Sequence, residues 1–114
     1  MLIAAALACA PRRPATADPR GEFALAVTNH HWLDVTIYVV HDGERSRVGT
    51  VTASSTETFL LSGRLLGVTR QMYLIGKALG SSELIRTEIL TVQPGQHVEW
   101  TLEHTLRRSS VAVY

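Results

Sequence analysis

The chain has 114 residues and a mass of 12.5 kDa, with 11 basic residues, 10 acidic residues and one Cys. This length suits one domain and is too short for a barrel enzyme or a two-lobed nucleotide-binding fold. The net charge of +1 gives no electrostatic case for nucleic-acid binding, and one Cys excludes an internal disulfide and a zinc site built on paired cysteines.

The first 21 residues differ in composition from the rest of the chain. Met1–Ala10 is apolar and uncharged, Pro11 ends this run, and a Pro-rich polar stretch continues to Arg20. The run is too short to span a bilayer, which takes about 20 residues, but it suits the hydrophobic region of a secretory signal peptide. We therefore expect a signal or lipid-anchor segment and an extended, non-globular tether over residues 1–21.

Ala6–Cys9 resembles the lipobox of bacterial lipoproteins, in which small or apolar residues precede a Cys that becomes acylated. The resemblance implies lipidation at Cys9, which would then be the mature N-terminus. Two alternatives remain open. Cleavage at the small-x-small signal Ala15–Ala17 would release a soluble protein, and Met1–Ala10 would otherwise stay as an uncleaved anchor.

From Glu22 to Tyr114 the apolar residues recur with a period of two, which predicts strands. In chain order we expect strands at 23–27 and 35–39, around 48–50 and 59–61, and at 72–75, 84–92, 98–102 and 111–114. Turn signals separate them at Asp42-Gly43, Ser62-Gly63, 80–82 and Gln93–Gln96. Helical turns are expected only at Leu65-Leu66 and Thr105–Arg108.

Seven or eight short strands, with turns every 8–12 residues or so, predict an all-β fold. We expect an antiparallel, immunoglobulin-like β-sandwich over residues 22–114. Either Trp100 or Trp32 is expected at the centre of its core.

Three segments, Val27–Tyr38, Arg47–Val51 and Pro94–Val98, resemble small bacterial envelope lipoproteins of uncharacterised function. The resemblance implies an immunoglobulin-like domain on the periplasmic or outer-surface side of a bacterial membrane, and it brings no activity with it. Asn29 and Asp34 are expected to flank a turn, and Gly49 to lie at a bulge or a close contact within a strand.

No pattern in the sequence predicts catalysis. The Ser residues lie in turn-like segments without a nucleophile elbow, and no phosphate-binding Gly loop is present. We expect no enzyme activity, no cofactor and no metal. A metal site that uses His97, Glu99 and a turn His is the less favoured alternative.

Two segments remain as candidate interfaces. The first is the loop 63–70, whose apolar residues lie between two Arg and either close the end of the sandwich or contact a partner. The second is the C-terminal segment, which is either an ordinary closing strand or an edge that pairs with a partner. The candidate interface residues are Arg64, Leu65, Leu66, Val68, Arg70, Arg107, Arg108 and Tyr114.

These features favour a non-catalytic, membrane-tethered β-sandwich that binds other envelope or membrane proteins. Its expected role is that of an accessory or stabilising subunit of a larger membrane complex, an expectation that rests on fold-level analogy. The alternative is a glycan-binding or small-ligand-binding module that uses Trp32, Tyr38 or Tyr73 as a stacking platform.

Overall fold

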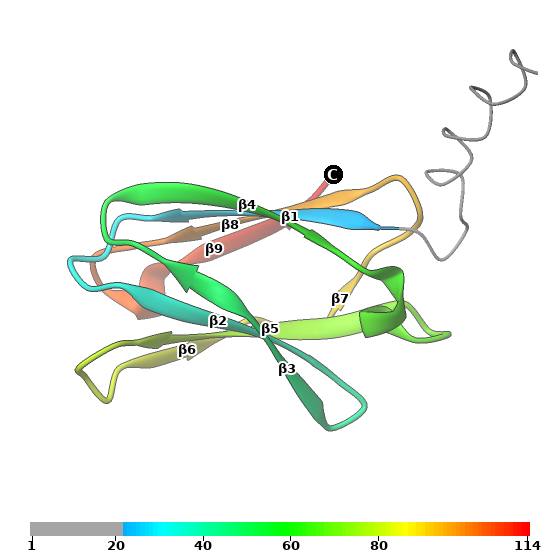
Figure 1. Ribbon diagram of the computed structural model, residues 1–114, viewed down its shortest axis with the longest axis horizontal. Helices are drawn as coiled ribbons and strands as arrows, with labels where there is room; N and C mark the ends of the chain where they lie inside the picture. The colour runs from blue at the N-terminus through cyan, green and yellow to red at the C-terminus, as the bar shows by residue number, and fades with distance from the viewer. Residues whose placement is uncertain (1–21) are drawn as a thin grey trace, which may run out of the picture.

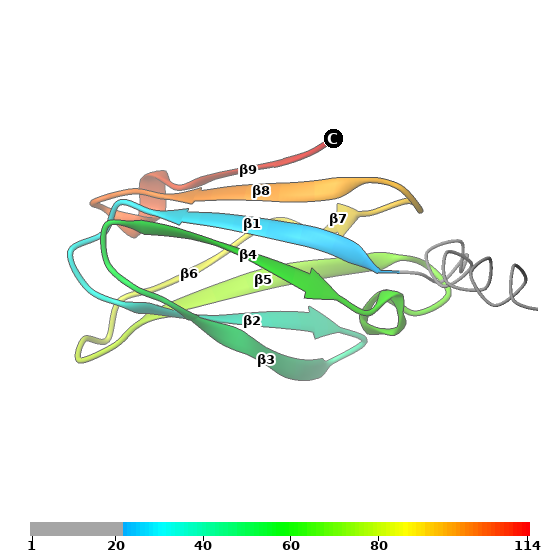
Figure 2. The same ribbon diagram turned by 45° about the horizontal axis from the view of Figure 1, so that its top comes forward.

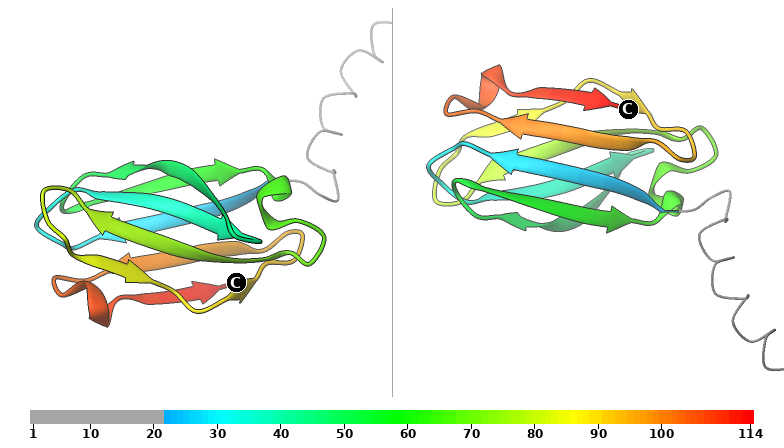
Figure 3. Two further views of the ribbon diagram at one scale, coloured as in Figure 1. Left: turned by 90° about the horizontal axis from the view of Figure 1, so that it is seen from below. Right: turned by 90° about the horizontal axis from the view of Figure 1, so that it is seen from above.

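The computed structural model describes residues 22–114, so the predicted leader and tether, with Cys9, lie outside the described residues. The described residues form nine strands in two layers, seen edge-on in Figure 1 and from above and below in Figure 3. The strands are β1 (Phe23–Asn29), β2 (Val35–His41), β3 (Glu44–Val51), β4 (Ser55–Leu61), β5 (Gln71–Ala78), β6 (Leu84–Arg86), β7 (Leu90–Thr91), β8 (His97–Leu102) and β9 (Ser110–Val113).

The strands form two sheets that pack face to face. Sheet A has the order β4-β1-β8-β9, and sheet B has the order β3-β2-β5-β6 with the short β7 also paired to β5. The predicted all-β, immunoglobulin-like sandwich is confirmed. One detail differs, because β1 and β8 are parallel while the other described pairs are antiparallel. Alternating residues locate strands but do not say which strands become neighbours.

The core lies between the sheets, and the period of two explains which residues enter it. In β1, Phe23, Leu25 and Val27 are buried while the residues between them are half-buried on the outer face. Trp100 of β8 is 1% exposed and takes the central core position, whereas Trp32 is 67% exposed. A buried aromatic ring of this kind removes about 150–250 Å² of surface from water.

The expected single strand at 84–92 is broken, which is why the sandwich has nine strands instead of seven or eight. β6 and β7 both pair with β5, but Ile75 lies opposite Arg86 and Met72 opposite Leu90, a register shift of one residue. Thr87 produces the shift, because its Oγ1 accepts the Leu74 amide proton at 3.0 Å in place of a main-chain oxygen. This β-bulge is invisible to a periodicity argument.

The turns follow the sequence signals. Asp42 and Gly43 both have positive φ, 52° and 78°, as a two-residue hairpin turn requires. The predicted bulge beside Gly49 is confirmed by a register shift opposite Ile37 and Tyr38. A Cβ on Gly49 would come within 2.9 Å of the Phe59 ring, so the predicted close contact is also confirmed.

Two 3₁₀ turns, η2 (Gly63–Leu66) and η3 (Leu106–Arg108), lie where the helical turns were expected. They occupy opposite ends of the sandwich, as Figures 1 and 2 show. Within residues 22–114 no helix has the length and apolar character needed to cross a membrane.

Candidate functional site

The side chains capable of catalysis or metal binding are dispersed over the described residues. Within residues 22–114 no three His, Cys, Asp or Glu side chains are grouped so that they could hold a metal ion. His97 Nε2 lies 3.3 Å from Glu99 Oε2 on the outer face of sheet A. His41 Nδ1 lies 2.8 Å from the main-chain oxygen of Gln71, to which it donates. The alternative metal site at His97 and Glu99 therefore lacks a third ligand among these residues.

His31 is fully buried and both of its ring nitrogens are hydrogen-bonded. Its Nδ1 accepts the Leu33 amide proton at 3.1 Å, so the ring proton lies on Nε2. Nε2 then donates to Glu83 Oε1 at 3.0 Å. The ring thus joins the β1–β2 loop to the β5–β6 turn. Its role is structural.

Asn29 completes this buried polar group. Its Oδ1 accepts the His31 amide proton at 2.8 Å, and its Nδ2 donates to the main-chain oxygens of Leu33 at 3.0 Å and Val51 at 3.1 Å. Each of these groups would otherwise be buried without a partner, which costs about 1–3 kcal/mol per group. The side chain therefore holds the β1–β2 loop against the end of β3.

Asp34 joins two further loops at the same end of the sandwich. Its Oδ1 accepts the Ala53 amide proton at 3.0 Å. Its main-chain oxygen accepts the Leu79 amide proton at 2.9 Å. Together with the contacts of Asn29 and His31, these bonds tie residues 29–34, 51–54 and 79–83 into one hydrogen-bonded unit. We call this unit the polar end.

The polar end presents exposed apolar side chains on a restrained backbone. Trp32 is 67% exposed, and its ring stacks on His31 with centroids 6.1 Å apart and planes at 24°. Leu79 and Leu84 flank the adjoining turn and are 45% and 50% exposed. These three residues, Trp32, Leu79 and Leu84, are called the Trp32 patch below. Sequence reasoning considered Trp32 for the core or for stacking and did not join it to the two Leu.

The predicted interface loop 63–70 mainly closes the other end of the sandwich. Leu66 is fully buried and Leu65 is half-buried against the core, so Leu66 belongs to the core and cannot contact a partner in this conformation. Arg64 and Val68 are exposed, and Val68 is 99% exposed. Gly67 makes the tight return with φ of 68° and ψ of −168°. We call this segment the apolar end.

The remaining predicted interface residues lie at three separate places. Arg70 is half-buried and its Nε donates to the main-chain oxygen of Val92, which makes it a tie within the apolar end. Arg107 and Arg108 are exposed in η3, where they line an open hollow of about 690 Å³. Tyr114 extends the β8–β9 pairing and stacks on His97 with centroids 5.3 Å apart. The loop 63–70 and η3 are therefore not one surface (Figure 1).

Tyr38 and Tyr73, the other proposed stacking platforms, are half-buried on the outer face of sheet B. The guanidinium carbon of Arg45 lies 4.5 Å from the ring centroid of Tyr38, and that of Arg86 lies 4.5 Å from the centroid of Tyr73. These are cation–π distances. Each guanidinium occupies the ring face on which a sugar would stack, so neither ring is an open platform.

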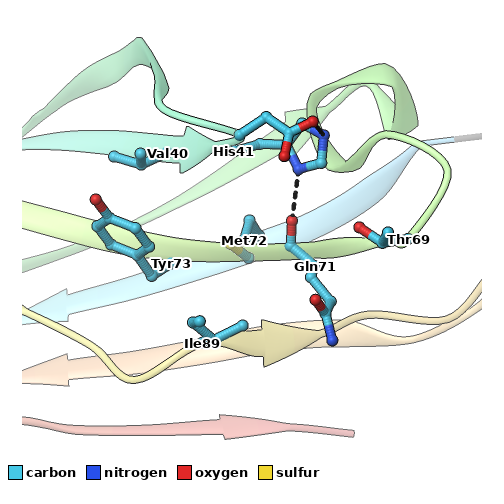
Figure 4. Close-up of a pocket in the computed structure, with 8 residues that line it drawn as sticks. Val40, His41, Thr69, Gln71, Met72, Tyr73 and Ile89 are labelled. Atoms are coloured by element: carbon cyan, nitrogen blue, oxygen red, sulfur yellow. Dashed lines mark hydrogen bonds and ion pairs between the residues drawn. The ribbon is translucent and has the colours of Figure 1, made fainter.

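A hollow of about 200 Å³ opens between the end of β2 and the start of β5. Val40, Met72, Tyr73 and Ile89 supply its apolar wall, and His41 closes one side through its bond to Gln71, as Figure 4 shows. Pockets for drug-sized ligands measure roughly 300–1,000 Å³. This hollow therefore suits a single side chain better than a whole small molecule.

No known protein family matches this sequence. No curated protein sequence matches it either. Among solved structures, the chain is similar to a protein from Eubacterium rectale whose structure was determined by NMR. The two are 19% identical, the match covers 85% of this chain and 90% of that chain, and the TM-score is 0.49.

Proposed function

We propose that this protein is a non-catalytic β-sandwich that is tethered on the periplasmic or outer-surface side of a bacterial membrane and docks on other envelope proteins. Its role is that of an accessory or stabilising subunit of a larger membrane complex. The observation that carries the proposal is the Trp32 patch. Its large exposed aromatic residue lies on a loop whose backbone is held by buried hydrogen bonds.

An exposed Trp on a restrained loop is well suited to binding a protein. Trp is among the residues whose truncation most weakens protein interfaces, by about 2 kcal/mol or more at a hot spot. A flexible loop would lose conformational entropy on binding, at about 0.5–1.5 kcal/mol for each ordered side chain. The hydrogen bonds of Asn29 and His31 hold the Trp32 loop in place before a partner binds. The loop therefore loses less conformational entropy on binding.

The alternatives have less support in the geometry. The buried polar side chains of the polar end are occupied by hydrogen bonds to the main chain and to one another, so these buried groups are not free to act as a nucleophile or base. A glycan-binding row needs several open rings, but of the three proposed platforms only Trp32 is exposed. We therefore place protein binding before glycan binding and before metal binding.

The tether is part of the proposal and rests on the sequence of residues 1–21. Lipidation at Cys9 would hold the sandwich close to the membrane, where its partners are concentrated. The short apolar segment Met1–Ala10 would serve the same purpose if it remains uncleaved. In either case we expect the full chain to fractionate with membranes.

The native mass of the full-length chain, extracted from its own membranes in mild detergent, tests the proposal. We expect wild-type protein to migrate in an assembly much larger than 12.5 kDa plus detergent. Trp32→Ala should reduce the assembled fraction at limiting concentration by about 30-fold, the equivalent of a 2 kcal/mol hot spot. Val68→Ala, at a 99% exposed site on the opposite end, is the matched control and should assemble normally.

Both variants remove an exposed side chain, so each should keep its unfolding free energy to within about 0.5 kcal/mol of wild type. A wild-type chain that migrates alone would overturn the proposed function. Normal assembly of Trp32→Ala would show that the Trp32 patch does not carry it.

A further inference from the structure

The outer face of sheet B collects the basic residues of three strands, β3, β5 and β6. In paired antiparallel strands, residues directly opposite one another lie on the same face. Because Val35, Ile37 and Val39 enter the core, the alternate residues of β2 and their partners point outward. The outward rows are Arg45-Val40-Tyr73, Arg47-Tyr38-Ile75-Arg86 and Thr50-Thr36-Lys77-Leu84.

We call Arg45, Arg47, Lys77 and Arg86, with Tyr38 and Tyr73, the basic face. The outward rows contain four cations and no Asp or Glu, in a chain whose net charge is only +1. Within residues 22–114 the ion pairs formed with carboxylates all involve His, so none of these cations has a carboxylate partner there. The acidic residues that bring the net charge down to +1 lie outside these rows, so positive charge is concentrated on this face.

Three guanidinium groups are held by contacts within the face. Arg45 and Arg86 lie over Tyr rings, and Arg47 donates through Nη2 to Thr50 Oγ1 at 3.1 Å. Stacking uses the flat face of a guanidinium and leaves its N–H edges available for the two oxygens of a carboxylate. The side chains are therefore arranged before any ligand binds.

The cations border an apolar centre. β3, with Arg45 and Arg47, and β6, with Arg86, are separated by β2 and β5, which places them about 14 Å apart at about 4.8 Å per strand. Val40 and Ile75 lie between them in the outward rows. The hollow of Figure 4 adjoins Val40 and Tyr73, its volume of about 200 Å³ suits one apolar side chain, and Asp42 also lines it. An apolar centre with a charged rim is the usual anatomy of a protein–protein interface.

We infer that the basic face docks a polypeptide surface of the partner in which carboxylates flank an apolar side chain. The carboxylates bind Arg45, Arg47 and Arg86, and the apolar side chain enters the hollow beside Tyr73. This inference rests on the proposed function and adds the chemistry of the partner. Leu84 of the Trp32 patch lies opposite Lys77 of the basic face, so the two surfaces adjoin and one partner can cover both.

Charge and shape favour this occupant over two others. A second copy docked through the same face would set four cations against four, which is repulsive. An anionic bilayer attracts cations, but Val40 and Thr36 at the centre of the face are 5% and 4% exposed, and the exposed apolar side chains Leu84 and Ile89 lie at its border. A polypeptide can instead bring a side chain down into the hollow.

Fluorescence anisotropy with defined peptides tests the inference on the purified full chain. The probe is a labelled ten-residue peptide of alternating Glu and Val, and the neutral probe has Gln in place of Glu. Arg45→Gln/Arg47→Gln should weaken binding of the acidic peptide about tenfold or more, as expected when charge-assisted hydrogen bonds are lost. Arg64→Gln/Arg108→Gln, which removes the same charge from exposed sites elsewhere, should change binding less than about twofold.

Equal binding of the acidic and neutral peptides, or equal weakening by both double variants, overturns the inference. A different pair of results would assign the face to lipid and also overturn the inference. In that case wild type would not bind the acidic peptide, and Arg45→Gln/Arg47→Gln would lose the binding to phosphatidylglycerol vesicles that wild type shows. The native-mass experiment separates the two proposals. Normal assembly of Arg45→Gln/Arg47→Gln rejects the inference alone, whereas a wild-type chain that migrates alone rejects the proposed function.

Discussion

The two ends of the sandwich are closed in opposite ways. At the polar end, Asn29, His31 and Asp34 bond three loops together and leave Trp32 exposed above them. At the apolar end, Leu66 enters the core and Leu65 lies half-buried beside it. The loops of the polar end are joined by hydrogen bonds, with Leu106 of η3 buried at the same end of the sandwich, whereas the loop 63–70 is held by hydrophobic contacts.

The difference indicates which end is available to a partner. A loop that closes the core with its own apolar residues has few left for binding, and at the apolar end the exposed apolar residue is Val68 alone among 63–70. In the loop 30–34, which buried polar side chains hold in place, Leu33 packs against the core but Trp32 remains exposed. Hydrophobic content therefore pointed to the loop 63–70, whereas burial points to the Trp32 patch.

The largest effect should come from truncating the apolar end. Leu66→Ala removes a fully buried side chain and should lower the unfolding free energy by about 4 kcal/mol through lost burial and a residual cavity. Urea titration followed by fluorescence of the buried Trp100, in a Trp32→Phe background, measures this change. Val68→Ala should stay within about 0.5 kcal/mol. A small loss for Leu66→Ala would mean that the loop 63–70 is not part of the core.

The next effect should come from the polar end. Asn29→Ala leaves the His31 amide and the Val51 carbonyl without their partner, so we expect a loss of about 3 kcal/mol at about 1–3 kcal/mol per buried group. The same titration applies. Ser55→Ala is the control, because it removes an exposed hydrogen bond to Thr52 at the same end and should cost at most about 1 kcal/mol. Equal losses in the two variants would contradict the central role of Asn29.

The smallest effect tests the backbone of the apolar end. Gly67 has φ of 68° and ψ of −168°, and a Cβ there would lie 2.1 Å from His41 Nε2. Gly67→Ala should cost about 2 kcal/mol from strain and displacement of the ring. Gly80→Ala, at φ of 78° with no atom within 4 Å of the added Cβ, isolates the positive φ and should cost about 1 kcal/mol. If Gly67→Ala lowers the unfolding free energy no more than Gly80→Ala does, the contact with His41 does not contribute to the loss.

Residue periodicity located most of the strands, the Asp42-Gly43 hairpin and the bulge at Gly49, because each of these depends on neighbours close in sequence. It did not locate the bulge at Thr87, whose hydroxyl accepts the amide proton of Leu74 on another strand. The parallel pairing of β1 with β8 was missed for the same reason. Both features depend on contacts between segments that are distant in the chain.

The surfaces divide in the same way. By itself the sequence determined the all-β class, the positions of most turns and the absence of a recognisable catalytic motif. Only the tertiary structure decided that Leu66 is buried, that Trp32 is exposed above buried polar groups, and that Arg45, Arg47 and Arg86 share one face. Burial and charge clustering are set by which strands become neighbours, and that choice depends on how the whole core packs.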